Sequence, residues 1–241
     1  MNDASTTTPA KAARWEDYID VFFSPRELFE RRAGDRLLPP LLALLAAGVL
    51  MYIITLPVNR MVMESSIANQ PPETAEAAQQ FGIIFLALGG LVVPIFMAIT
   101  VTFAAFLLWG IGQTFGAEFG FRNAMLVATY AAFVYLIAQL LAGVIILVTG
   151  ADTVDPVRDM SFGVLRFIGT EDTDGSLAAV LRRFDIFAIW QAILWGLGVM
   201  IVGRVSKGRA ILIAVLAWIL YAVPGVIVGA LDFGGGAPPA A

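Results

Sequence analysis

The sequence predicts an all-α integral membrane protein with five transmembrane helices and a short amphipathic N-terminal helical arm. Hydrophobic residues make up 59% of the 241 residues, and the mean hydropathy is +0.83, which is too apolar for a water-soluble domain. Five apolar stretches contain none of the 15 basic and 19 acidic side chains. Continuous runs of this kind suit helices that cross a hydrocarbon layer of roughly 30 Å, whereas barrel strands would alternate. The predicted spans, within a membrane domain over residues 37–231, are 37–57, 81–111, 124–149, 186–203 and 210–231.

The chain begins with small polar residues, 1–13, which are predicted to be disordered, and an arm over residues 14–36 follows. Aromatic residues at helical spacing predict a first amphipathic helix in this arm. Ser24, Pro25 and Glu27 match a capping box at the start of a second helix. We expect both helices to lie on the membrane interface, and the alternative is that they dock on the protein's own bundle. The side chains expected to face lipid or a partner are Trp15, Tyr18, Phe22, Arg26, Arg31 and Arg32, and Glu16, Asp17 and Asp20 are expected on the opposite, polar face.

The second predicted span is too long for a single upright crossing. Its 31 residues, 81–111, would extend about 46 Å as one helix. Pro94 lies inside it and removes a backbone hydrogen bond, which predicts a kink. The sequence leaves open whether the first part, 81–90, crosses the bilayer or lies along its outer interface.

An acidic loop, 151–183, separates the third and fourth spans, and it contains a predicted helix start near Gly175. Asp185 stands at the mouth of the fourth span, where it is expected to cap the helix N-terminus. A basic turn then joins the last two spans as a tight hairpin and carries three further candidates for contact with lipid or a partner, Arg204, Lys207 and Arg209. The tail, 232–241, is rich in Gly and Pro and is predicted to be flexible.

The distribution of basic residues predicts the orientation in the membrane. With five crossings, ten Lys and Arg residues fall on the side of the N-terminus and five on the other side. Basic residues favour the cytoplasmic side. We therefore expect a cytoplasmic N-terminus and an external C-terminus.

Several classes of function are disfavoured by what the chain lacks. It has no Cys and no His, so disulfides, thiolate chemistry, Cys/His zinc sites and His proton relays are excluded. No phosphate loop, nucleophile elbow or basic block for nucleic acid is present. Ionisable groups at membrane depth usually mark transport or catalysis, and the predicted spans contain none. We expect no enzyme activity and no cofactor.

The strongest polar side chains within the spans are Gln139 and Gln191. Buried amides in bilayers usually bridge helices, and the alternative is a path for a neutral solute. Trp190 fits helix packing or an interfacial belt. Small residues at a four-residue spacing, such as Gly112 and Gly116, favour packing within the monomer, with a homo-oligomer as the alternative.

The segment 183–191, Arg-Phe-Asp-Ile-Phe-Ala-Ile-Trp-Gln, resembles the signature of the Yip (Ypt-interacting protein) domain family in its bacterial branch. Ser24-Pro25 with Phe29, the pair Phe121-Arg122 and the basic turn extend the resemblance over about residues 15–230. The resemblance implies a five-helix membrane domain with a cytoplasmic N-terminus, here in the bacterial cytoplasmic (inner) membrane. Eukaryotic relatives bind Rab-type GTPases and associate with vesicle trafficking and membrane shaping. The family supplies no catalytic residues.

These observations favour a non-enzymatic membrane scaffold or adaptor that organises the membrane or recruits a partner through its cytoplasmic face. A small permease or channel for a neutral or lipid-like solute is the first alternative, and an accessory subunit of a larger membrane complex is the second. The expected partners are the lipid bilayer, a cytoplasmic protein and a further copy of the chain, and nucleic acid is not expected.

Overall fold

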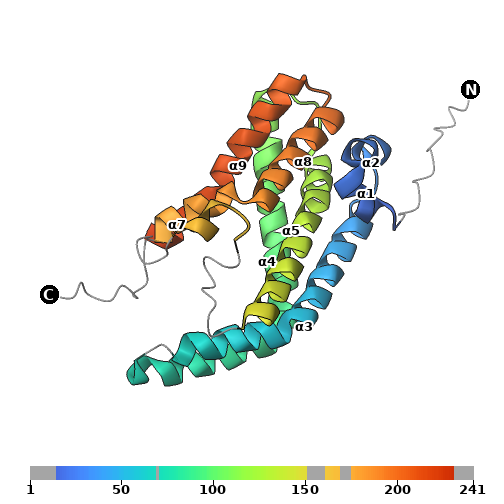
Figure 1. The fold of residues 1–241 in the computed structure, drawn as a ribbon. Coiled ribbons are helices and arrows are strands. Elements are labelled where there is room, and N and C mark those ends of the chain that lie inside the picture. Colours follow the sequence, from blue (N-terminus) through green and yellow to red (C-terminus); the bar gives the residue numbers. More distant parts are fainter. Residues whose placement is uncertain (1–14, 69–70, 151–160, 169–174, 231–241) are drawn as a thin grey trace, which may run out of the picture.

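The computed structural model describes residues 15–68, 71–150, 161–168 and 175–230, which form a helical bundle (Figure 1). The segment 1–13 and the tail 232–241 lie outside the described residues, as does much of the acidic loop. No strand occurs in the described part of the chain, where one isolated antiparallel bridge joins Gly163 to Asp185. The helices are α1 (Asp17–Phe23), α2 (Pro25–Arg32), α3 (Leu38–Ala68), α4 (Pro72–Thr114), α5 (Phe121–Thr149), α7 (Gly175–Leu181), α8 (Ile186–Val202) and α9 (Lys207–Ala230), with short 3-10 turns η2 (Val164–Phe167) and η4 (Arg182–Phe184).

Four helices of the described chain are long and apolar enough to cross a membrane. They correspond to Leu38–Glu64, Leu86–Thr114, Phe121–Thr149 and Lys207–Ile227. The predicted fourth span forms α8, whose 17 residues extend about 25 Å. The all-helical membrane class is confirmed, but a count of five full spans is not, because α8 is shorter than the hydrocarbon layer.

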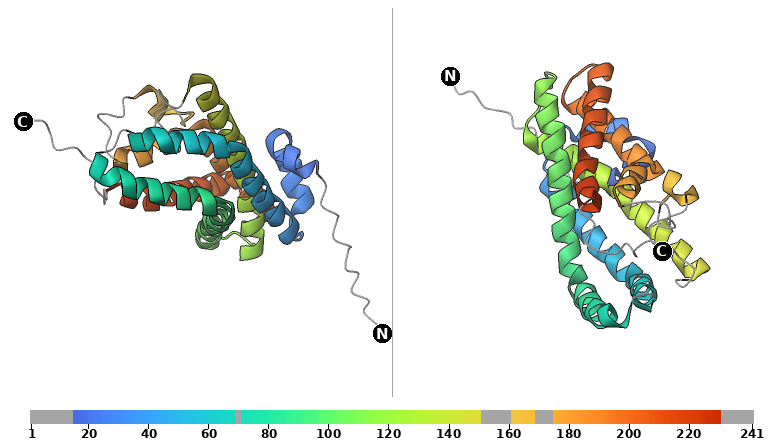
Figure 2. Two further views of the ribbon diagram at one scale, coloured as in Figure 1. Left: turned by 90° about the horizontal axis from the view of Figure 1, so that it is seen from below. Right: turned by 90° about the vertical axis from the view of Figure 1, so that its left-hand side faces the viewer.

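The helices α3 and α4 are longer than the predicted spans. Helix α3 continues through Pro57 to Ala68, and α4 runs unbroken through Pro94 over 43 residues. Their adjoining ends form a helical hairpin that turns away from the bundle (Figures 1 and 2). The part of α4 that is apolar enough to span begins at Leu86, so it includes only the second half of the segment 81–90.

Helix α5 forms the centre of the bundle. Its residues from Ala124 to Val134 are buried without a break, and small residues let neighbouring helices approach closely. Gly198 of α8 packs against the Val127 side chain, and Gly196 of α8 faces Ala214 of α9. These small positions are used inside the monomer. Gly116 lies beyond the end of α4 with φ +74°, so the Gly112–Gly116 pair is not a helix-packing motif.

The α4–α5 turn and the α8–α9 turn contact each other at the end of the bundle where the arm lies. The predicted hairpin between α8 and α9 is confirmed, and Arg204 in its turn adopts a φ of +52°. The backbone N–H of Glu118, in the turn between α4 and α5, donates to the Gly203 carbonyl at 3.1 Å. This contact holds the two turns side by side.

Candidate functional sites

The arm helices α1 and α2 lie above the start of α3 and beside α5 and α8 (Figure 1). Pro25 occupies the first turn of α2 as predicted. The predicted capping box is wrong, because the Ser24 side chain makes no cap hydrogen bond. The Ser24 backbone N–H instead donates to the Asp20 carbonyl and ends α1. Ser24 is therefore a tight link between two helices.

A buried ion-pair network ties α1 to α2. The Asp17 carboxylate accepts from the Arg31 Nη2 at 2.7 Å and from the Arg32 Nε at 2.9 Å. Arg32 also donates to Asp35 at 2.7 Å, and Arg31 donates to Asp20. Hydrogen bonds to Asp20 and Asp17 raise the pKa of Arg31 above its usual value. The pairing keeps these charges neutralised where they are removed from water.

The network corrects the predicted polarity of the arm. Asp17 is buried rather than on a solvent face, and the Arg32 side chain is 3% exposed rather than facing lipid or a partner. Arg31 is partly buried against the same carboxylate. The physical reason is that both guanidinium groups turn inward to Asp17. The sequence pattern did not indicate this because the partners are 14 and 15 residues apart.

Apolar contacts complete the docking of the arm. Val21, Leu28 and Phe29 are fully buried in the main core. The Tyr18 ring lies 5.0 Å from that of Phe133, and burial, followed by the charge of Asp17, raises the pKa of Tyr18. Phe22 is half-buried against the same core. The docked alternative therefore describes the arm, and neither Tyr18 nor Phe22 faces fully outward.

Other side chains of the arm and of the α8–α9 turn do face outward. Trp15 is 70% exposed and Phe23 is 82% exposed. Arg26 is exposed and pairs with Glu30 at 2.9 Å. We call the outward groups at this end of the bundle the end surface; its members are Trp15, Ile19, Phe23, Arg26, Arg204, Lys207 and Arg209.

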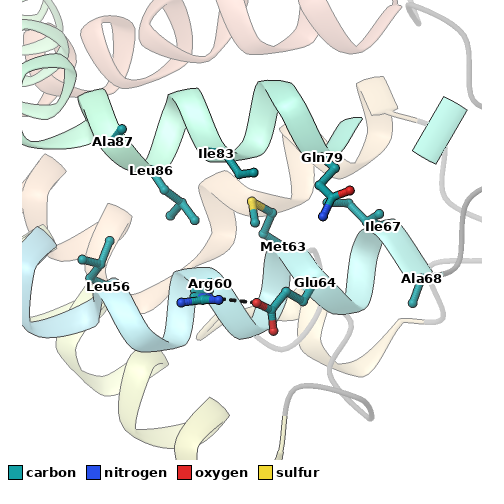
Figure 3. Close-up of a pocket in the computed structure, with 10 residues that line it drawn as sticks. All are labelled: Leu56, Arg60, Met63, Glu64, Ile67, Ala68, Gln79, Ile83, Leu86 and Ala87. Atoms are coloured by element: carbon teal, nitrogen blue, oxygen red, sulfur yellow. Dashed lines mark hydrogen bonds and ion pairs between the residues drawn. The ribbon is translucent and has the colours of Figure 1, made fainter. Parts of the chain in front are cut away.

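The hairpin of α3 and α4 holds an open pocket of about 660 Å³ at the opposite end (Figure 3). Aliphatic side chains and Met63 form most of its walls. Its charged residues, Arg60 and Glu64, pair with each other at 2.8 Å. This arrangement is an apolar groove without a catalytic pair. Among the described residues, no group of three or more acidic side chains is placed to hold a metal ion.

Asp185 caps α8 as predicted and also anchors the preceding loop. Its Oδ1 accepts from the Phe187 backbone N–H at 2.8 Å, and its Oδ2 accepts from the Phe162 N–H at 2.6 Å. The Phe162 and Phe187 rings meet edge to face at 5.2 Å. These contacts fix the start of α8 within the bundle.

The same loop carries Arg183 to the level of the middle of the bundle. The guanidinium lines a cavity of about 290 Å³ together with Thr100, Tyr135, Gln191 and Tyr221. Tyr135 is the middle residue of α5, and Thr100 is the middle residue of the apolar part of α4. An ionisable group therefore lies at depth, which the charge-free spans did not predict. The available signal was the Arg-Arg-Phe-Asp run before an unusually short apolar stretch.

The remaining predicted residues divide between two cavities and the core. Gln191 is buried in the cavity with Arg183. Gln139 lines an adjoining cavity of about 430 Å³, which also contacts Tyr135, Arg183 and Asp185. Trp190 packs against the main core. Pro94 is half-buried in α4 and lines neither cavity.

A sequence model of the Yip1 domain matches residues 19–228. The chain belongs to the Yip1 domain family. Comparisons with curated proteins and with solved structures found no match. The Yip1 domain match includes α2 and the segment that carries Arg183, whereas Trp15 and Asp17 precede its first residue.

Proposed function

We propose that this Yip1 domain protein is a non-enzymatic membrane adaptor that recruits a cytoplasmic protein through its end surface. In this proposal it resides in the bacterial inner membrane, with the N-terminus in the cytoplasm and the C-terminus outside. The distribution of basic residues supports this orientation, because ten of the 15 fall on the side of the N-terminus and basic residues favour the cytoplasmic side. Arg204, Lys207 and Arg209 are among these ten.

The fixed docking of the arm is the observation that supports an adaptor. Buried ion pairs around Asp17 and the buried side chains of Leu28 and Phe29 hold α1 and α2 on the bundle. Trp15 and Phe23 are left exposed on this fixed support. Exposed aromatic groups commonly mark interaction sites, and a preorganised surface loses little conformational entropy on binding.

The test compares full-length proteins in nanodiscs prepared from native membranes, with co-purifying proteins quantified by mass spectrometry. The variant W15A/F23A removes the two exposed aromatic side chains. The matched control is Phe167→Ala, which removes an 86% exposed aromatic residue from the loop before α7. Deletion of the whole arm is a poorer test, because it would also remove Leu28 and Phe29 and expose the core residues that they cover.

A soluble protein present in stoichiometric amount with the wild type and F167A, but lost with W15A/F23A, is the expected result. Loss of bound anionic lipid without loss of any protein would contradict recruitment and favour membrane organisation by the end surface. Co-purification of another membrane protein in all three samples would favour an accessory subunit.

A permease for a neutral or lipid-like solute is the second candidate. The observation that favours it is the cavity beside Gln191, which has several polar side chains in its wall, since polar groups in membrane bundles often line solute paths. Loss of flux in liposomes on Gln191→Leu, with the fold retained, would support this candidate over the adaptor.

A further inference from the structure

The Arg183 guanidinium is buried with unused hydrogen-bond donors. Its Nε and Nη1 atoms are inaccessible to solvent and donate no hydrogen bond. None of the ion pairs formed by the described residues includes Arg183. Asp185, the nearest carboxylate in the sequence, instead accepts from the backbone amides of Phe162 and Phe187. Among the residues that the structure describes, this positive charge has no anionic partner.

Tyr221 holds the guanidinium in place. The Arg183 Cζ lies 5.0 Å from the centroid of the Tyr221 ring, within the range of a cation–π contact. Stacking of this kind fixes the group without using its N–H donors. The Nε and Nη1 donors are left over for a ligand that enters from the adjoining cavity and displaces the side chains that cover them.

The cavity beside Arg183 suits a small oxyanion. It measures about 290 Å³, and further donors come from the Gln191 amide and the Tyr135 hydroxyl. Thr100 also lines it, but its hydroxyl donates to the Met97 carbonyl at 3.0 Å. Arginine with neighbouring amide and hydroxyl groups is a typical set of ligands for phosphate or carboxylate. A monoanion there would also neutralise a charge that is costly to bury unpaired.

The wall of the cavity at α4 extends toward lipid. Phe96 lines the cavity and is 64% exposed on the outer side of this apolar helix. In a membrane, such a residue contacts acyl chains. A ligand whose charged head reaches Arg183 could therefore leave its chain against Phe96.

We propose that Arg183, with Gln191 and Tyr135, binds the phosphate or carboxylate head of an anionic single-chain amphiphile at the middle of the bundle. This site is separate from the end surface and does not depend on recruitment of a protein. Its chemistry differs from the neutral-solute path, because the ligand must carry a negative charge.

The test measures binding to the full-length protein in neutral detergent by native mass spectrometry, with the melting temperature as a second readout. The probes are lysophosphatidic acid, lysophosphatidylcholine with the same acyl chain, and inorganic phosphate. The variants are Arg183→Gln and Gln191→Leu. Arg182→Gln is the control, because it removes the same charge from the adjacent, exposed arginine.

We expect one lysophosphatidic acid per protein, bound at least tenfold more tightly than lysophosphatidylcholine. Arg183→Gln should abolish this preference, Gln191→Leu should weaken it, and Arg182→Gln should preserve it. If inorganic phosphate alone raised the melting temperature as much as lysophosphatidic acid does, the oxyanion site would stand, but its ligand would be a water-soluble anion rather than a lipid. Equal binding by wild type and Arg183→Gln, or equal loss with Arg182→Gln, would overturn the proposal.

The stability of the empty protein supplies an independent check. Because the Arg183 charge has no anionic partner among the described residues, the Arg183→Gln variant should melt no lower than the wild type when no ligand is present. A substantially lower melting temperature would show that the guanidinium is already compensated within the protein, and this would overturn the proposal.

Discussion

The Asp17 carboxylate and the Arg32 guanidinium form a buried ion pair that joins the two helices of the arm. The pair is linked to Arg31 and Asp35, so one carboxylate on α1 organises the end of α2. Removing one partner of a buried pair leaves the other charge buried and uncompensated, and this lowers the free energy of unfolding strongly. Replacing both partners by apolar residues would cost far less. The relationship makes the arm part of the folded core rather than a separate anchor.

Asp17→Asn should therefore lower the free energy of unfolding by about 3–5 kcal/mol. Chemical unfolding in a single detergent measures the change. Glu30→Gln is the control, since it breaks the exposed pair with Arg26 and should cost at most about 1 kcal/mol. Similar losses for the two variants would contradict the structural role of the buried pair.

Asp185→Ala should destabilise the start of α8 and release the segment before it. The side chain supplies a helix cap to Phe187 and a second hydrogen bond to Phe162, and together they are worth about 2–4 kcal/mol. Hydrogen exchange should rise at residues 161–168 and at the first turn of α8. Asp185→Asn retains an acceptor oxygen and should lose less; an equal loss would show that the negative charge, rather than the cap, is decisive.

Gly198 is a position where the helices α5 and α8 approach closely. A Cβ there would collide with the Val127 side chain, whereas a Cβ on Gly90 of α4 would meet nothing within 4 Å. Gly198→Val should cost about 1–3 kcal/mol through overpacking. Gly90→Ala should instead be neutral or stabilising by up to about 1 kcal/mol. The two melting temperatures, measured side by side, check the packing, and equal values would contradict it.

Local sequence patterns predicted the features of this fold that depend on short stretches of chain. Charge-free runs located α3, α4, α5 and α9, and the position of Asp185 predicted its cap. The burial of Asp17 was missed because its partners lie in another helix. The depth of Arg183 was missed because it lies outside the apolar runs. The packing of α7 on α9 and the stacking of Arg183 on Tyr221 bring it inward, and neither contact is visible in the sequence.

The cavity beside Gln191 gives the adaptor and the permease different expected outcomes. For an adaptor, Gln191→Leu and Gln139→Leu alter only helix packing, and buried amides in membrane bundles contribute about 0.6–2 kcal/mol. We therefore expect small changes in melting temperature and no change in the glycerol permeability of liposomes that contain either variant. Gln139 and Gln191 line different cavities. A solute path through one cavity should therefore be blocked by the substitution in that cavity and not by the other. Glycerol flux above that of protein-free liposomes, lost with Gln191→Leu and kept with Gln139→Leu in folded protein, would establish transport and displace the adaptor as the main function.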